Sequence, residues 1–358
     1  MRRREVVAAV VLGGPSLTAT ANGLDIAGTG ATFPAKVYQQ WAEQYQRDTG
    51  LKVGYAPTGS SAGVRQIVAR QVDFGATDVP LGADELARQS LFQFPTLVGG
   101  IVPFVNLPGV ANGALRLSGD VLAAIFGGRV ARWNDRAIAA LNPGLALPDL
   151  AIERVVRSDG SGTTTVFVEY LNRVSPATPL ALASGRAQWP GATTGAEGSD
   201  KLVAAVKASR GAIGYVSSDY ALRDKLTAVS LRNQRGEWVA PTLEGLAAAI
   251  QGAGLFKDGL EAAPLIDVDG PRAWPIVTAT YVVVPRVPGD LNRAGRALNF
   301  FYRSFLLGDK AVAGTGFAPL PSRTQARIVS LLAGFRMPDG RPLPVLSRAA
   351  DRLVVSAR

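Results

Sequence analysis

Apolar and polar positions along the chain follow two alternating patterns, one typical of short strands and the other typical of helices. The first strand is predicted over 24–28, and Pro34 then opens a helix that Gly50 ends. Apolar side chains such as Val37 and Trp41 recur in this helix at four-residue spacing, so one of its faces should be buried. Strands that alternate with helices in this way are typical of an α/β fold.

The same alternation continues over most of the chain. Further strands are predicted over 51–55, 72–76, 101–106, 152–156, 212–216 and 277–285. Further helices are predicted to begin near 60, 163 and 199, and to cover about 290–307 and 323–333. Ser199 is expected to cap the helix near 199, because a serine in front of an apolar stripe often accepts a hydrogen bond from a free helix N–H group.

Three loops share one arrangement, in which a strand is followed by glycine and hydroxyl residues and then by the start of a helix. They are GTGATFPA (28–35), PTGSSAG (57–63) and DGSGTTT (159–165). A helix start presents unpaired N–H groups and a partial positive charge, and glycine lets the backbone approach a ligand closely. Each loop alone is explained by ordinary capping. If the three converge, they form an anion site built from neutral donors.

The third loop also carries a cation. Arg157 ends the predicted strand, and its planar guanidinium suits a tetrahedral oxyanion. Arg157 and Asp159 can form a simple surface ion pair, which would contribute little, but we favour Asp159 as the residue that orients Arg157. Asp78 follows another predicted strand, where an aspartate is commonly a turn residue. Its alternative role is to accept a hydrogen bond from a protonated anion.

Composition removes several kinds of chemistry. The chain has 358 residues, enough for two domains, and it contains no cysteine and no histidine. Thiol and histidine catalysis and Cys/His zinc sites are therefore excluded. We expect no cofactor, no metal and no catalytic residue. An enzyme that uses Ser161 or Thr163 as a nucleophile would need a nearby base, and no Gly-Lys-[Ser/Thr] phosphate loop is present.

The N-terminus is predicted to be a signal peptide over 1–21. It combines a basic start with an apolar run over 6–12 that is too short to span a membrane, and Ala21 ends a small-residue cleavage motif. Cleavage there lowers the formal charge from +10 to +8, because three arginines and one glutamate are removed (10 − 3 + 1). We expect a soluble protein in the periplasm, without a lipid anchor because there is no cysteine.

The positive charge has two interpretations. It can attract small anions over a distance, or it can bind nucleic acid. The basic residues are scattered, and aromatic residues, which would stack on bases, make up only 7% of the chain and lie mostly on predicted core faces. We therefore expect no nucleic-acid partner.

Long segments of the chain resemble a known family in that family's order. They are GTGATFPAKVYQQWAEQY (28–45), GSSAGVRQI (59–67), VDFGATDVPL (72–81), FQFPT (92–96), FGGRVARWND (126–135), LNPGL (141–145), RVVRSDGSGTT (154–164), GAIGYV (211–216) and WPIVTATYVVV (274–284). On these motifs the chain resembles the PstS family, the phosphate-binding proteins of bacterial high-affinity phosphate ABC transporters. A lone GSGT would have been weak support, but so many motifs in sequence make the resemblance specific.

The resemblance implies a type II periplasmic solute-binding protein with two α/β lobes, joined by two crossing strands and closing over the ligand. The first lobe would hold 22–101 and 278–358, and the second lobe 102–277. The family's ligand positions carry over to Thr32, Phe33, Ser60 and Asp78 in the first lobe, and to Arg157, Ser161, Gly162 and Thr163 in the second.

The resemblance also implies partners. Inorganic phosphate would be the ligand, and the membrane permease and ATPase subunits of a phosphate ABC transporter would receive it. We expect the receptor to be a monomer. Another tetrahedral oxyanion, such as sulfate, arsenate or a phosphonate, is the alternative ligand, and Asp78 argues against sulfate because sulfate has no proton to donate.

Overall fold

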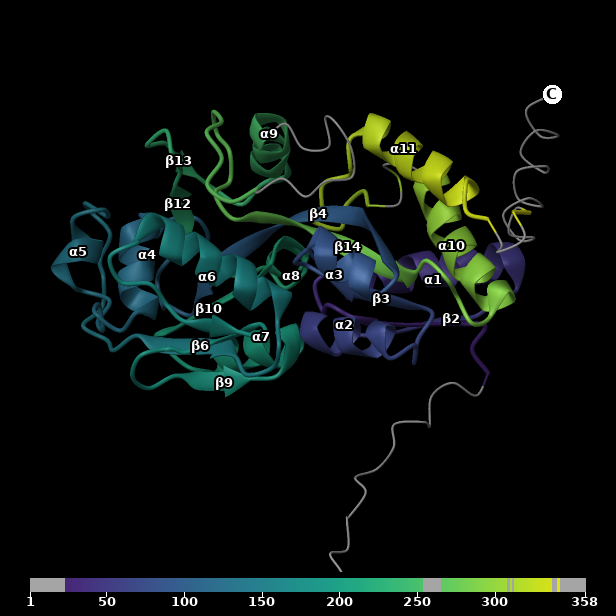
Figure 1. Ribbon diagram of the computed structural model, residues 1–358. Coiled ribbons are helices and arrows are strands. Elements are labelled where there is room, and N and C mark those ends of the chain that lie inside the picture. Colours follow the sequence, from purple (N-terminus) through teal and green to yellow (C-terminus); the bar gives the residue numbers. More distant parts are fainter. Residues whose placement is uncertain (1–22, 254–264, 308–309, 311, 337–339, 342–358) are drawn as a thin grey trace, which may run out of the picture.

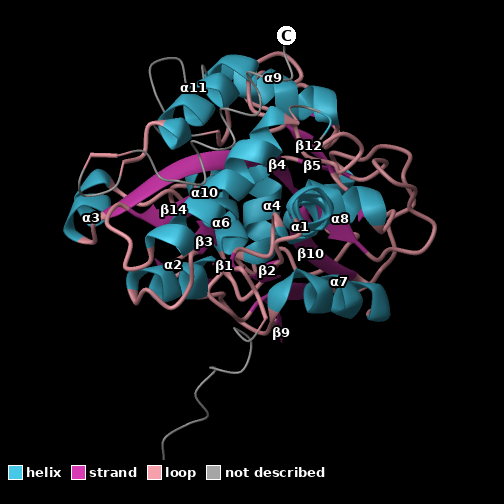
Figure 2. Cartoon of the chain, turned by 90° about the vertical axis from the view of Figure 1, so that its right-hand side faces the viewer, coloured by secondary structure: helices cyan, strands magenta, loops and turns pink. Residues whose placement is uncertain are grey.

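The computed structural model describes residues 23–253, 265–307, 310, 312–336, 340 and 341. The predicted signal peptide over 1–21 lies outside the described residues, as does the chain from 342 onward. The elements fall into two groups, which lie side by side in Figure 1. Figure 2 shows helices on both faces of the sheet, so the chain has the α/β layers that the hydrophobic pattern predicts.

The first group is built on the N-terminal strands. β1 lies between β2 and β3 and is parallel to both, with one helix after each strand. The elements are β1 (Ile26–Gly30), α1 (Ala35–Thr49), β2 (Val53–Ala56), α2 (Ser60–Val68), β3 (Phe74–Thr77) and α3 (Ala83–Arg88). Gly50 ends α1 with a φ of 78°, the left-handed conformation expected of a glycine cap.

The second group has the same design. β6 lies between β10 and β9 and is parallel to both. The elements are α4 (Gly119–Phe126), α5 (Arg136–Ala139), β6 (Glu153–Arg157), α6 (Gly162–Val174), β9 (Thr194–Ala196), α7 (Gly198–Ala208), β10 (Ala212–Ser217) and α8 (Ser218–Arg223). The apolar stripe predicted for the helix after the third loop is buried in α6.

Two long antiparallel strands join the groups. β14 (Val277–Pro285) pairs with residues 91–100 of β4 (Leu91–Val105), and β10 pairs with residues 101–105 of the same strand. The resulting sheet has the order β2-β1-β3-β14-β4-β10-β6-β9, with β11 (Thr227–Ala228) beside β4 (Figure 1). The positions at which the chain passes between the lobes, placed at 101/102 and 277/278 from the sequence, stay a prediction.

The remaining elements pack around this frame. Two small sheets contain β13-β12-β5 and β7-β8. Their strands are β5 (Arg116–Leu117), β7 (Leu182–Ala183), β8 (Arg186–Ala187), β12 (Ser230–Arg232) and β13 (Trp238–Val239), and the last helices are α9 (Leu243–Ala253), α10 (Leu291–Leu306) and α11 (Ser322–Ala333). α10 packs on α1, where the rings of Phe301 and Tyr38 meet edge to face. No helix within the described residues is both long and apolar enough to span a bilayer.

One prediction about a helix end is wrong. Ser199 does not cap α7, because α7 begins at Gly198 and Glu197 occupies the N-cap position. Ser199 therefore lies in the first turn, and its hydroxyl contacts a side chain from the other group of elements, Thr32.

Candidate functional site

The three predicted loops lie where the sequence places them, between a strand and the helix that follows. They join β1 to α1, β2 to α2 and β6 to α6. Ser161 is the N-cap of α6, and its hydroxyl accepts a hydrogen bond from the backbone N–H of Thr164 at 3.2 Å. The starts of α1 and α2 have no side-chain cap.

The loops of the two groups meet each other directly. The backbone N–H of Ser61 donates to the carbonyl of Gly160 at 3.2 Å. A Cβ atom at Gly162 would lie 2.5 Å from Oγ of Ser60 and 2.9 Å from Cβ of Asp78. Only glycine fits at position 162, because any side chain there would push the two loops apart. The third loop therefore faces the ends of β3 and α2.

Arg157 lies at the centre of this contact and is almost completely buried. Its Nε donates to Asp159 at 2.6 Å, and its Nη2 contacts the second oxygen of the same carboxylate. Its Nη1 donates to the hydroxyl of Thr32 in the other group at 3.2 Å and to that of Ser199 in its own group at 3.4 Å. The guanidinium is thus held from one side, in the orientation expected if Asp159 positions it.

Asp159 has a pKa that is held below its usual range. Burial acts to raise this pKa, but the hydrogen bonds and charge of Arg157 and the N–H of Gly198 outweigh burial. Asp159 is therefore ionised at neutral pH and offsets the charge of Arg157.

Asp78 is also buried, but in a different environment. One carboxylate oxygen accepts a hydrogen bond from Thr280 at 2.8 Å, and the backbone carbonyl accepts one from Thr278 at 2.8 Å. Burial raises the pKa of Asp78 to about 7, although Thr280, Arg157 and Thr163 act to lower it. This carboxyl therefore exchanges a proton near neutral pH.

The predicted ligand residues come together, and every one whose side chain carries a polar atom is almost completely buried. These are Thr32, Ser60, Asp78, Arg157, Ser161 and Thr163. The backbone positions Phe33 and Gly162 accompany them, and the ring of Phe33 packs edge to face on Phe317. The group offers many donors and one carboxyl that can accept, which suits a small oxyanion that carries a proton. Among the described residues, no group of three or more histidine, cysteine or acidic side chains could hold a metal ion.

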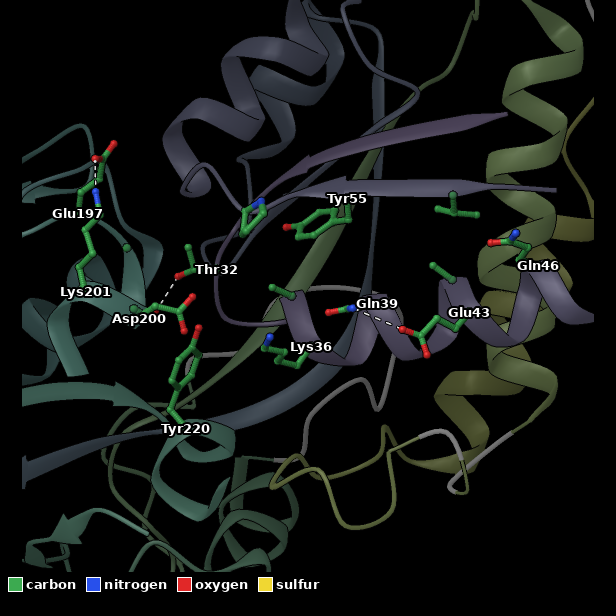
Figure 3. Close-up of a pocket in the computed structure, with 16 residues that line it drawn as sticks. Thr32, Lys36, Gln39, Glu43, Gln46, Tyr55, Glu197, Asp200, Lys201 and Tyr220 are labelled. Carbon is green, nitrogen blue, oxygen red and sulfur yellow. Dashed lines mark hydrogen bonds and ion pairs between the residues drawn. The ribbon is translucent and has the colours of Figure 1, made fainter. Parts of the chain in front are cut away.

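An outer pocket of about 430 Å³ adjoins this group between α1 and α7. Thr32 and Ser199 are among its lining residues. Lys36 of α1 faces Asp200 and Tyr220 of the second group (Figure 3). Arg157 is not among the lining residues, but its guanidinium contacts two of them, Thr32 and Ser199.

Sequence reasoning missed three side chains at the site. Thr278 and Thr280 of β14 hold Asp78, and Ser199 contacts Thr32 and Arg157. The alternation of threonines in a strand that is otherwise apolar was the available signal for the first two. Nothing in the local sequence distinguishes Ser199 from a capping residue.

Comparison with known proteins agrees with the fold. The family model for the PBP superfamily domain matches residues 16–302. The phosphate-binding protein PstS of Xylella fastidiosa is 40% identical over 297 residues, covering 83% of this chain and 81% of that protein. PstS of Pasteurella multocida is 38% identical over 329 residues, covering 92% and 95%.

Solved structures share the fold at lower identity. A high-affinity periplasmic phosphate-binding protein, solved with bound phosphate, superposes with a TM-score of 0.66 at 23% identity, covering 86% of this chain and 93% of that one. A phosphate-binding protein from Stenotrophomonas maltophilia gives 0.65 at 21% identity, covering 85% and 93%. The fold is thus that of a two-lobed solute-binding protein. Within that class, the chain belongs to the PstS family of phosphate-binding proteins.

Proposed function

We propose that the protein is a periplasmic receptor that binds inorganic phosphate between its two lobes and delivers it to the permease and ATPase subunits of an ABC transporter. The observation that carries the proposal is the buried set of neutral donors around one arginine and one acceptor, Asp78. The relatives named above are phosphate-binding proteins, which supports the same ligand. Binding requires no covalent step, and a receptor of this kind has no catalytic role.

Eight residues would contact phosphate in this proposal. The set comprises Thr32, Phe33, Ser60, Asp78, Arg157, Ser161, Gly162 and Thr163. The first four belong to the lobe that carries β1 to β3, and the last four lie between the end of β6 and the start of α6. Contacts from both lobes are complete only when the lobes are closed, so phosphate should stabilise the closed form.

Calorimetric titration of the chain from Asn22 onward with phosphate tests the proposal. We expect saturable binding of one phosphate per chain and no release of the chromophore from a chromogenic phosphate ester. A protein that takes up no phosphate, or that turns over the ester, would contradict the proposal.

Small-angle scattering tests the closure of the lobes separately. The radius of gyration should fall when phosphate is added to saturation, because the ligand joins residues of both lobes. Identical scattering curves with and without phosphate would count against the hinge while leaving the ligand assignment intact.

A further inference from the structure

The hydroxyl of Ser199 contacts two predicted ligand residues, although Ser199 is not itself a predicted ligand residue. It lies in the first turn of α7 and is 4% exposed. Its Oγ is 2.8 Å from Oγ1 of Thr32 and 3.4 Å from Nη1 of Arg157 (Figure 3 labels Thr32 among the residues that line the pocket). Thr32 belongs to the opposite lobe, so this contact crosses the cleft.

Nη1 of Arg157 lies 3.2 Å from the hydroxyl of Thr32 and 3.4 Å from that of Ser199, so the direction of the Thr32–Ser199 hydrogen bond depends on what else accepts from Thr32. A guanidinium can only donate, so Nη1 of Arg157 donates to the oxygen of Thr32 at 3.2 Å. If Thr32 donated its proton to Ser199, it would have none left for an anion. If Ser199 donates instead, the oxygen of Thr32 accepts two hydrogen bonds and its own O–H must point elsewhere. An anion that accepts from Thr32 selects this second arrangement.

We propose that Ser199 is a positioning residue, which donates to Thr32 and thereby directs the hydroxyl of Thr32 at the bound oxyanion. The inference rests on the proposed function, because it takes Thr32 as a phosphate ligand. It adds the direction of two hydrogen bonds, because Ser199 donates to Thr32 and Thr32 donates to phosphate. It also implies that Thr32 and Ser199 separate the outer pocket from Arg157, because these two residues line the pocket and Arg157 does not.

A second hydroxyl crosses the cleft and provides a matched comparison. Oγ of Ser61 donates to the backbone carbonyl of Ser184 at 2.9 Å. Unlike Ser199, Ser61 makes no side-chain hydrogen bond to any of the eight proposed ligand residues in the described part of the chain. Loss of this bond removes one interaction between the lobes and leaves the hydrogen bonds of the Thr32 hydroxyl unchanged.

The test is a double-mutant cycle measured by phosphate titration. Ser199→Ala should weaken phosphate binding by about ten-fold, since a hydrogen bond within a charged network is lost, whereas Ser61→Ala should change it by no more than about three-fold. In a Thr32→Val background, Ser199→Ala should have a much smaller effect, because the hydroxyl through which Ser199 acts is gone and only its long contact with Arg157, at 3.4 Å, remains. Ser199→Thr, which keeps the hydroxyl, should bind more tightly than Ser199→Ala.

Three results would overturn the inference. The first is that Ser199→Ala lowers phosphate affinity equally in the wild-type and Thr32→Val backgrounds. The second is that Ser61→Ala and Ser199→Ala lower phosphate affinity equally. The third is that Ser199→Thr binds phosphate no more tightly than Ser199→Ala. If the alanine variant does not fold, Ser199→Cys replaces it in the cycle, because it keeps the volume and is only a weak donor. Failure of the wild-type protein to bind phosphate would reject the proposed function itself, whereas additive losses in a wild type that binds would reject only the role of Ser199.

Discussion

The two carboxyl groups of the site, Asp159 and Asp78, are both buried and differ in what they face. Asp159 contacts two nitrogens of Arg157, which keeps its pKa low and the carboxylate charged. Asp78 faces threonine hydroxyls, and burial raises its pKa to about 7. The carboxylate of Asp159 offsets a cation, whereas that of Asp78 can accept a hydrogen bond from a protonated ligand.

This difference indicates how a basic protein can bind an anion selectively. Arg157 is already offset by Asp159, so the site has little excess positive charge to attract every dianion. An anion would be held mainly by backbone N–H groups and hydroxyls, which act strongly in a site without water. Asp78 then favours an anion with a proton to donate and opposes one without.

The largest expected effect comes from removing the cation. Arg157→Ala should weaken phosphate binding by on the order of 2–5 kcal/mol, because a desolvated charged partner is lost and Asp159 is left buried without its cation. Titration calorimetry measures the loss, and circular dichroism checks that the fold is intact. Arg132→Ala, which removes a surface arginine paired with Asp149, is the control. Binding within a few-fold of wild type would show that Arg157 is not a ligand.

The second effect is on stability of the ligand-free protein. The pKa of Asp78 is raised from 3.8 to about 7, so the folded state holds a proton that the unfolded state releases. The contribution of Asp78 to the free energy of unfolding is fully present below about pH 4 and is lost as the pH rises through 7. The upper limit is about 4 kcal/mol, from roughly 1.4 kcal/mol for each unit of pKa shift.

Urea unfolding at a series of pH values between 4 and 8 measures the slope of the unfolding free energy against pH. Asp78→Asn should flatten it, whereas Asp84→Asn, on an exposed position of α3, should leave it unchanged. Part of the slope should persist in Asp78→Asn, because burial also raises the pKa of Asp219 to about 7. The same slope in wild type and Asp78→Asn would contradict the buried, protonated state of Asp78.

A smaller effect is expected on selectivity. Asp78→Asn should keep much of the phosphate affinity but narrow the preference for phosphate over sulfate by about ten-fold, because an amide no longer repels an anion that has no proton. Both dissociation constants are needed for both proteins. An unchanged ratio would leave Asp78 as a turn residue without a role in selectivity.

The smallest effect is expected at the other carboxyl. Asp159→Asn loosens the hold on Arg157, which should weaken binding, but it also leaves the guanidinium charge uncompensated, which should strengthen anion binding. The two changes oppose each other, so phosphate affinity should shift by less than about 1 kcal/mol. A loss as large as that of Arg157→Ala would show that orientation by Asp159 dominates.

The sequence predicts the loops of the site well because their chemistry is local. A glycine and hydroxyl run between a strand and a helix indicates a helix start wherever it occurs, and all three loops fit this pattern. The first part of β4 was missed, because Pro95 and the glycines at 99 and 100 are unfavourable in a strand. β4 tolerates them because it pairs with β14 along this stretch.

The partners of the site residues are harder to predict because they come from distant segments. Thr280 is 202 positions from Asp78, and Ser199 is 167 positions from Thr32. Local sequence assigns such residues to strand or helix propensity, and only the packing of the two lobes brings their hydroxyls to the cleft. The cap assigned to Ser199 was wrong because α7 begins one residue earlier, at Gly198.

Competition between phosphate and sulfate in the wild-type protein tests the central claim most directly. We predict that at pH 8, above the pKa of about 7 of Asp78, phosphate binds and sulfate in at least about hundred-fold excess does not displace it, because ionised Asp78 accepts a hydrogen bond that only protonated phosphate can donate. Displacement of phosphate by an equal concentration of sulfate would contradict the claim that one buried carboxyl selects the ligand.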